Sequence, residues 1–453
     1  MRASDAGRAL AFALRGAETS IAVGAPYEAE QILGVFLREP SAREFPPEIP
    51  LTFVRALMEQ SKADAALRVL DQVLPDPRLA PEQLAEGAAM RAAAVFLLNS
   101  ETGSRYFEAA DSALDAARKT ANPTLVTKAL FQYARSGLIV GDIGRLHAAR
   151  RELQRMVEEK KAEGLPLMLQ TLAYCEQLAC DVRSAASTFE DAFALTVDST
   201  NPSEIITALT SYAFCKYSLC EFGAARDTYR QALALSMKIG DDYKTSVLCS
   251  KLCALETSRG NYTEAIEWGS QSTDYGGRAV NQPDYALSWI NLSDAYMLTG
   301  RANEARACWG EARKWMDQER NWQIRVAYLL ESASFALMSG NVGQAINLVT
   351  SAEQASEGKE GAFSDPSMFA KYRVFRVAHT AGNEAAWPIA SEAKARFRDR
   401  HPFYYLNALA AAAWLERRAC GTYSAETAHE LRLFDTLGAQ GRRALLRAQG
   451  FLD

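Results

Sequence analysis

Histidine is scarce in this sequence: among 453 residues there are only His147, His379, His401 and His429. This scarcity argues against a histidine-rich metal site. Charge of one sign is also lacking, because 50 Lys and Arg residues face 55 Asp and Glu residues and the net charge is −5. A general nucleic-acid binder needs a basic face, so the composition does not favour nucleic acid as a partner. We expect no metal and no other cofactor.

Long apolar runs are also missing. The N-terminal run Ala9–Leu14 ends at Arg15, and the longest run near the C-terminus is Ala408–Leu415. A membrane-spanning helix needs roughly 20 apolar residues, so we expect no contact with a membrane. No apolar core of secretory length or cleavage pattern is visible near the N-terminus. We therefore expect a cytoplasmic protein whose eight cysteines are reduced thiols.

Motifs for catalysis are absent as well. The sequence contains no glycine-rich phosphate loop, no dinucleotide fingerprint and no G-x-S-x-G elbow. His429-Glu430 begins a zinc-protease motif, but the second histidine is missing. His401 precedes Pro402, which favours a surface loop rather than a catalytic base. We expect no catalytic residue, and a protein that is not an enzyme.

The sequence does contain a repeat with a period of 40 residues. Turn signals recur at 40-residue steps, and apolar residues between them follow helical spacing. Prolines stand where new helix pairs should begin, which suits the first helical turn because a proline there loses no hydrogen bond. The chain holds about eleven such units. The turns lie at Cys180, Cys220, Gly260, Gly300 and Gly340, and the prolines are Pro123, Pro166, Pro202, Pro283, Pro366 and Pro402.

This pattern predicts an all-α fold, an α-solenoid of about eleven antiparallel helix hairpins. Each hairpin has one apolar stripe per helix and completes its core by stacking on the next hairpin. We expect one solenoid over residues 1–453, with irregular repeats in 1–81, regular repeats in 82–356, and degenerate repeats and a cap in 357–453.

One unit resembles the tetratricopeptide repeat family in detail. The family places a bulky residue, a leucine, a small residue, a tyrosine, a glycine and three residues of the second helix at fixed steps. This resemblance implies a right-handed superhelix whose first helices line a concave, peptide-binding surface. The matching residues are Trp289, Leu292, Ser293, Tyr296, Gly300, Ala305, Trp309 and Ala312.

The period departs from the family, whose usual unit is about 34 residues. The longer unit is similar to the helical sensor arms of large ATP-binding regulators of the LuxR class (MalT-like). It also resembles the peptide-binding quorum-sensing regulators of bacilli and kinesin light chains. Residues 7–30 resemble the first repeat after the ATPase of such regulators, while the ATPase itself is absent. The resemblance implies a partner- or ligand-sensing arm of a bacterial regulator.

The concave groove is the candidate site. Rings supply contact area at low entropy cost and amides satisfy a ligand's backbone, so a wall of both suits an extended peptide or protein segment. The alternative is that these side chains only pack against the neighbouring repeat. Carrying the family's register over this sequence predicts groove residues Gln170, Tyr174, Gln177, Thr210, Phe214, Tyr217, Ser250, Asp294 and Met297.

The cysteines also follow the rhythm, since Cys175 and Cys180 recur as Cys215 and Cys220. One interpretation is a thiol cluster for metal or redox sensing. The other is a set of small core residues in equivalent slots, which the missing C-x-x-C spacing favours.

The C-terminal region differs in charge. Residues 371–453 contain 13 Lys and Arg against 8 Asp and Glu. This region either meets an acidic partner or forms a solvated face, which terminal repeats need for solubility. The segment Ala439–Leu452 looks like an amphipathic capping helix.

These observations predict a non-enzymatic scaffold that binds a protein or peptide in its concave groove. The alternative is a self-associating structural adaptor that forms a homodimer through the ends of the solenoid.

Overall fold

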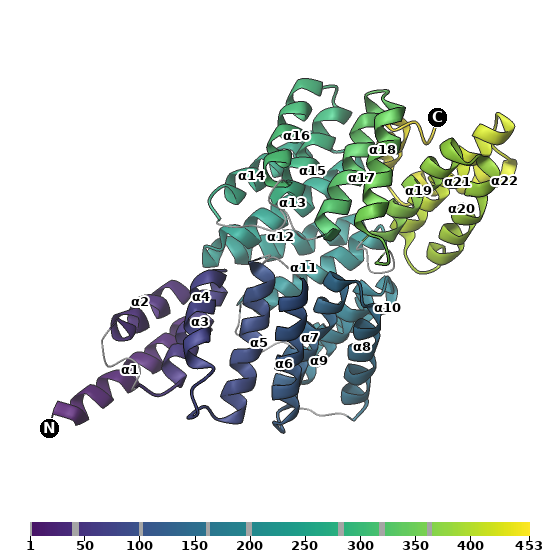
Figure 1. Cartoon of the computed structure of the whole chain (residues 1–453). Coiled ribbons are helices and arrows are strands. Elements are labelled where there is room, and N and C mark those ends of the chain that lie inside the picture. Colours follow the sequence, from purple (N-terminus) through teal and green to yellow (C-terminus); the bar gives the residue numbers. More distant parts are fainter. Residues whose placement is uncertain are drawn as a thin grey trace.

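The computed structural model describes residues 2–38, 45–98, 103–159, 164–195, 202–279, 285–316, 322–359 and 365–453. The described residues are helices and turns without a strand, so the all-α prediction is correct. Consecutive helices pack in pairs along the chain from α1 to α20 (Figure 1). The first ten helices are α1 Arg2–Ala22, α2 Pro26–Leu37, α3 Glu48–Glu59, α4 Ala63–Val73, α5 Pro81–Leu97, α6 Gly103–Arg118, α7 Pro123–Val140, α8 Ile143–Glu158, α9 Leu165–Leu178 and α10 Val182–Leu195.

The second half continues the pairing up to α21, which is followed by short helices. The second-half pairs are α11 Pro202–Ser218 with α12 Phe222–Ile239, α13 Asp242–Arg259 with α14 Tyr262–Gly276, α15 Tyr285–Leu298 with α16 Ala302–Met316, α17 Trp322–Met338 with α18 Val342–Ala355, and α19 Pro366–Thr380 with α20 Asn383–Phe397. The chain ends with α21 Pro402–Cys420, α22 Ala425–Glu430, α23 Leu433–Thr436 and α24 Gln440–Ala448.

The 40-residue turn signals share one backbone conformation. Cys180, Cys220, Gly260, Gly300 and Gly340 all have positive φ, between 61° and 93°. A left-handed residue ends the first helix of a hairpin, because it lets the following N–H groups bond back to the last helical carbonyls. Glycine adopts this conformation without strain, whereas the two cysteines do so at a cost.

Most of the prolines begin helices as the sequence suggests. Pro123, Pro202, Pro366 and Pro402 are the first residues of α7, α11, α19 and α21, and Pro166 is the second residue of α9. The predicted start at Pro283 falls outside the described residues. Pro388 is an exception, because it lies inside α20.

Successive turns of the superhelix contact each other directly. The Gln323 amide at the start of α17 donates to the Leu138 carbonyl near the end of α7 over 2.8 Å, and the neighbouring Trp322 indole donates to Ile139. Lys359 packs against Gly141 in the same region. Arg183 donates to the Asp399 carbonyl, 216 residues further along. Residues about half a chain apart are therefore direct neighbours.

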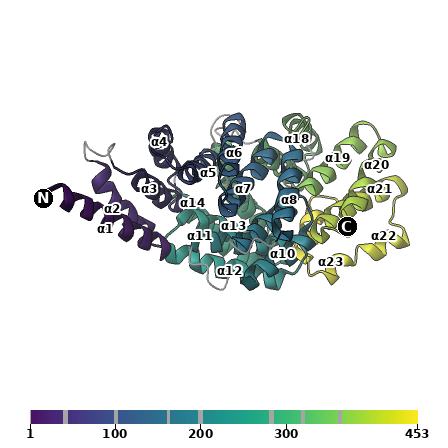
Figure 2. The same cartoon turned by 90° about the horizontal axis from the view of Figure 1, so that it is seen from below.

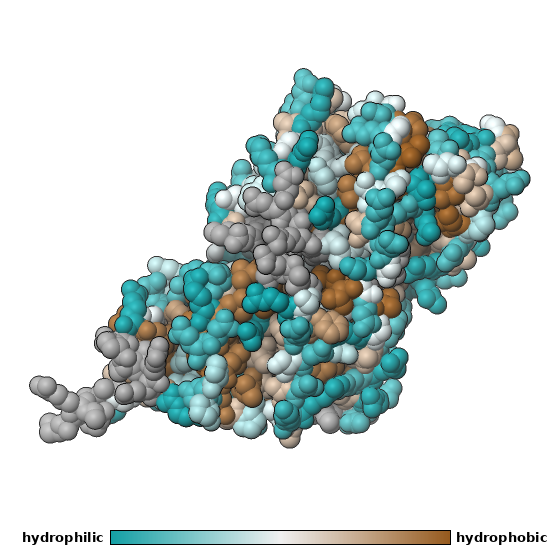
Figure 3. Space-filling model, viewed as in Figure 1, coloured by the Kyte–Doolittle hydropathy of each residue, from teal (hydrophilic) through white to brown (hydrophobic). Residues whose placement is uncertain are grey.

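The two views show the consequence for the overall shape. Helices α5 to α10 form the lower part of the molecule and α13 to α19 the upper part, with α11 and α12 running between them (Figure 1). Turned by 90°, the chain is elongated, with the N-terminal helices at one end and α20 to α22 at the other (Figure 2). The surface is mainly hydrophilic with scattered apolar patches (Figure 3).

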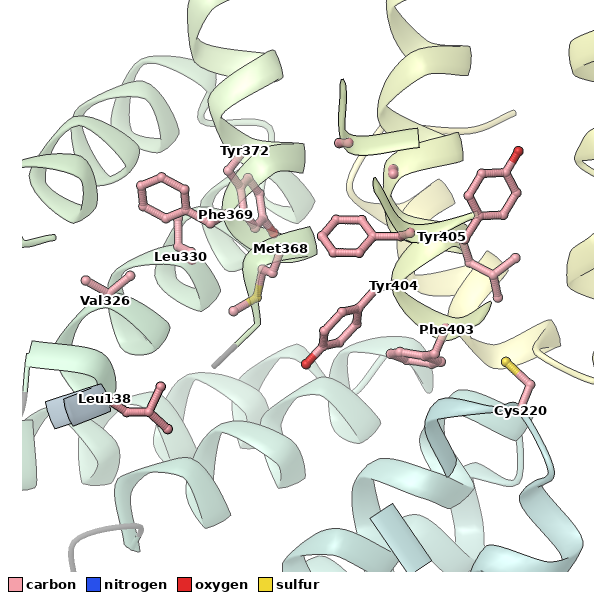
Figure 4. Packing of buried hydrophobic residues seen from close by; sticks show 14 of the residues in the cluster. Leu138, Cys220, Val326, Leu330, Met368, Phe369, Tyr372, Phe403, Tyr404 and Tyr405 are labelled. Carbon is pink, nitrogen blue, oxygen red and sulfur yellow. The ribbon is translucent and has the colours of Figure 1, made fainter. Parts of the chain in front are cut away.

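The largest core cluster runs from Ala85 to Leu452 and joins the two parts. Figure 4 shows Leu138 of α7 below Val326 of α17, and Phe403 of α21 beside Cys220. The Tyr217 and Phe403 rings lie 4.7 Å apart. Burying such side chains stabilises a fold by about 1.5–3 kcal/mol each, so the core itself holds the turns together. None of the helices described is long and apolar enough to span a bilayer.

The C-terminal helix does not act as a simple terminal cap. α24 packs against α13 and α15 on the inner side of the superhelix. Gly441 makes this possible, because a Cβ there would lie within 3.0 Å of the Thr257 carbonyl oxygen and of the Gly260 backbone. The basic residues divide accordingly: Arg443 pairs with Asp435 at the surface, whereas Arg442 faces the interior.

His401 was expected in a surface loop, and this is wrong. Its side chain is 1% exposed, its ring stacks on Tyr404, and its Nδ1 accepts the Tyr404 N–H as the N-cap of α21. Burial lowers the pKa of His401 to about 3, so the ring is neutral. Pro402 correctly predicted the start of α21, but a proline after a histidine does not indicate how deeply the histidine side chain is buried.

Candidate functional site: the concave cavity

A cavity of about 590 Å³ occupies the inner side of the superhelix. Its wall comes from the first helix of each hairpin from α5 to α19 and from α21, and α24 closes part of it. Volumes of this size are typical of ligand-binding pockets in proteins. Aromatic, amide and charged side chains alternate along its wall, which is the character expected of a surface that holds an extended polar chain.

Six of the nine predicted groove residues line this cavity. Gln170 lines an adjoining cavity of about 390 Å³, to which Tyr174 also contributes. Ser250 lines a smaller one of about 230 Å³. Met297 lines none of these three cavities. The six are Tyr174, Gln177, Thr210, Phe214, Tyr217 and Asp294.

Some of these polar groups already bond to the adjacent repeat. The Tyr217 hydroxyl lies 2.9 Å from Ser258 Oγ, and Asn291 Nδ2 donates to Ser250 Oγ over 3.0 Å. Both pairs are 41 residues apart, so they connect first helices of successive hairpins. Thr210 donates to its own helix at the Ile206 carbonyl. Tyr217, Ser250 and Thr210 therefore have structural bonds that a ligand would have to share.

One end of the cavity is cationic. Arg135 of α7 donates to Tyr106 Oη over 3.0 Å and to Gln132 Oε1 over 3.0 Å, and its guanidinium lies 3.6 Å from the Phe96 ring centroid. All three partners are neutral. Burial, the main cause, raises the pKa of nearby Tyr174 to about 12, so that hydroxyl stays protonated. The positive charge of Arg135 has no carboxylate partner within the described part of the chain.

The other end gathers three carboxylates and two cations. Asp294 of α15 and Glu331 of α17 line the cavity, as does Asp365 just before α19. Burial raises the pKa of both Asp294 and Glu331, and the charge of Glu331 raises that of Asp294 further. The cations are Lys371, which is 1% exposed, and Arg442. Burial lowers the pKa of Lys371 to about 7.

Both cations direct their hydrogen bonds to amides. Arg442 donates to Asn407 Oδ1 over 2.7 and 3.0 Å. Lys371 donates to Gln449 Oε1 over 2.8 Å, and Gln449 in turn donates to Ser334 Oγ. The two cations therefore act on the carboxylates through their field. The bonds of Arg442 join α24 to α21, and the chain from Lys371 through Gln449 to Ser334 joins the end of α24 to α19 and α17.

Several cavity residues were not predicted, although the sequence carries a signal for them. Ser211, Lys251, Asn291 and Glu331 stand 40 residues apart, and all four line the cavity. Ser211 and Lys251 directly follow the predicted Thr210 and Ser250, and Asn291 and Glu331 occupy the same position in the next two repeats. Extending the predicted set by one position in each first helix would have included all four. Arg442 carries no such signal, because α24 reaches the site through contacts with the distant helices α13 and α15. Arg135 lies on α7, before the hairpins over which the register was carried.

All eight cysteines are free thiols. Cys420 is exposed, Cys180 is half-buried, and the other six are buried. Burial raises the pKa of Cys175 and of Cys220 to about 12, which keeps both as inert thiols at neutral pH. Within the described ranges no group of three or more His, Cys, Asp or Glu side chains is arranged to hold a metal ion.

No protein-family model matches this sequence, and no curated protein matches it. Solved structures do match. The Cut9–Hcn1 hetero-tetramer of APC/C aligns with a TM-score of 0.51 and 11% identity over 96% of this chain and 86% of that one. A Rap protein complexed with competence and sporulation factor aligns at 0.46, with 12% identity over 84% and 99%. Yeast Tom70 aligns at 0.41, with 10% identity over 98% and 96%.

At these identities the likeness concerns the fold alone. The Cut9–Hcn1 alignment extends over nearly all of this chain and consists of helical repeats, as the sequence predicted. The chain is therefore an α-solenoid of the tetratricopeptide-like kind.

Proposed function

We propose that this chain is a non-enzymatic scaffold that binds a peptide or an extended protein segment in its concave cavity. The observation that carries the proposal is the cavity itself, whose wall is built by the first helices of eight successive hairpins and by α21. An extended ligand is the shape that meets so many repeats at once. The wall offers rings such as Phe214 for contact area and amides such as Gln177 for a ligand's backbone.

The fold suits a regulatory arm of a bacterial regulator, which is the finer form of this proposal. A ligand that contacts both parts of the superhelix stabilises one relative placement of those parts, and this is a means of signalling. A change in the relative placement of the two parts would alter the contacts between Gln323 and Leu138 and between Arg183 and Asp399.

A selection with a displayed random heptapeptide library tests the proposal. Purified wild-type protein is expected to enrich specific peptides, and the double variant Tyr174→Ala/Phe214→Ala is expected to bind those peptides at least tenfold more weakly. Truncating two rings removes contact area from the cavity wall.

The matched control removes apolar side chains from the outer surface. Met237→Ala/Val342→Ala changes exposed residues of α12 and α18, the second helices of their hairpins. It is expected to bind the selected peptides like the wild type. Equal weakening by both double variants would contradict the assignment of binding to the cavity.

A second candidate function, a homodimeric adaptor, is favoured by one surface feature. Phe12, Val23, Tyr27 and Val35 of the first hairpin and its turn are 60–70% exposed. Apolar side chains gathered at a solenoid end are typical of an interface. Light scattering would show a dimer that the variant Phe12→Ser/Val35→Ser disrupts; a strict monomer at high concentration rules this function out.

A further inference from the structure

At the acidic end of the cavity, carboxylates outnumber cations. Asp294, Glu331 and Asp365 stand against two cations, Lys371 and Arg442. The field of Arg442 also lowers the pKa of Lys371, after burial itself, to about 7, so that the lysine carries its charge only part of the time at neutral pH. Three acidic side chains therefore face two basic ones at this end of the cavity.

The three carboxylates are not equivalent. Asp365 caps α19, where its Oδ1 accepts from the Ser367 hydroxyl and from the N–H groups of Ser367 and Met368. Asp294 and Glu331, in contrast, have no ion pair or hydrogen bond with any of the residues that the structure describes. Both are half-buried and line the cavity. A buried carboxylate costs free energy until a cation or a donor meets it.

An orphaned hydroxyl on the same wall also indicates a polar occupant. Ser218 Oγ belongs to a side chain that is 1% exposed, and it has no hydrogen-bond partner among the described residues. Ser218 lines the same cavity from α11. Buried hydroxyls are nearly always satisfied, so an unsatisfied one beside a cavity is the kind of group that a bound ligand completes.

From this arrangement we infer that the cavity selects ligands with a basic group, a lysine or arginine side chain of the bound peptide, and seats that group between Asp294 and Glu331. The inference rests on the proposed peptide-binding function and names its specificity. A guanidinium or ammonium replaces the missing counter-charge and offers several donors to two carboxylates. A basic group at this position would supply the partner that both half-buried acids lack.

The heptapeptide selection tests this inference when its sequences are read. Peptides selected on the wild type are expected to be enriched in lysine or arginine, and replacement of that residue by norleucine should weaken binding at least tenfold. The variant Asp294→Asn/Glu331→Gln should show the same loss with the basic peptide and none with its norleucine analogue. Glu304→Gln/Glu311→Gln, which removes two acids from the outer helix α16, should bind both as the wild type does.

The outcomes separate the two proposals. If no peptide is selected, the proposed function fails and this inference fails with it. If peptides are selected without enrichment of basic residues, or if Asp294→Asn/Glu331→Gln binds the basic peptide as tightly as the wild type, the inference is overturned while peptide binding stands. A titration with spermidine distinguishes a free polyamine from a peptide side chain: tighter binding of spermidine than of the best peptide would overturn the assignment to a peptide.

Discussion

Gly441→Ala is the sharpest test of the packing of α24. The glycine lies in the first turn of α24, directly against the C-terminal end of α13. A Cβ at this position would meet the Thr257 carbonyl oxygen and the Gly260 nitrogen and Cα within 3.0 Å. All three are backbone atoms, so no side-chain rotation relieves the contact. Either α24 moves away from α13, or the turn at Gly260 shifts.

The magnitude follows from two opposing effects. Overpacking of a tight contact costs about 1–3 kcal/mol, and alanine in a helix recovers about 0.5–1 kcal/mol relative to glycine. We expect a net loss of about 1–2 kcal/mol in the free energy of unfolding. Leu445 and Leu446 anchor the helix at 3% and 0% exposure, and their burial limits how far α24 can move.

Urea unfolding monitored by tryptophan fluorescence gives the free energy, and hydrogen exchange of residues 440–452 reports where the change lies. Gly310→Ala is the matched control, because Gly310 is also helical and a Cβ there meets nothing within 4 Å. That variant is expected to be as stable as the wild type or slightly more stable. Unchanged exchange and an unchanged midpoint in Gly441→Ala would refute the close approach of α24 and α13.

Three further predictions concern single positions elsewhere in the fold. Ala305→Leu should lower the melting temperature, because Ala305 is fully buried where two helices cross and overpacking costs about 1–3 kcal/mol; an unchanged melting curve would count against the packing described here. Ser61→Gly should raise stability by up to about 1 kcal/mol in urea unfolding, because Ser61 has a φ of 58° that costs a side chain about 1–2 kcal/mol; a loss of stability would contradict this. His401→Asn should flatten the acid side of the stability profile. The pKa of His401 is about 3 in the folded state, below about 6.5 for the unfolded chain, so the unfolded state binds the proton first and stability is lost as pH falls from about 6.5 towards 3. Asparagine keeps an N-cap acceptor without a proton site; an unchanged slope of stability against pH would show that other groups dominate.

The repeat architecture could be predicted because it is local. The left-handed turns at Gly260, Gly300 and Gly340 follow from glycine's freedom at positive φ, and prolines such as Pro366 mark helix starts through their own backbone geometry. The same register placed Phe214 and Asp294 on the cavity wall.

The interior of the site could not be predicted, because distant segments build it. Arg135 and Arg442 are more than 300 residues apart, and nothing in their local sequence says that they line one cavity. The depth of His401 is set by α21 packing into the core, which a local pattern does not encode. Met297 lies 80 residues after Tyr217, at the same position two repeats on, but it lines none of the described cavities.

The bonds that join successive turns also affect how this chain folds. A linear repeat array gains its stability from nearest neighbours, so pieces of it can fold separately and quickly. Here the Gln323–Leu138 and Arg183–Asp399 contacts span 185 and 216 residues. Long-range contacts of this kind must wait for large loops to close, which slows folding. During synthesis the N-terminal hairpins emerge well before α17 and α21, so their inner faces remain without these partners until the second half of the chain has been made.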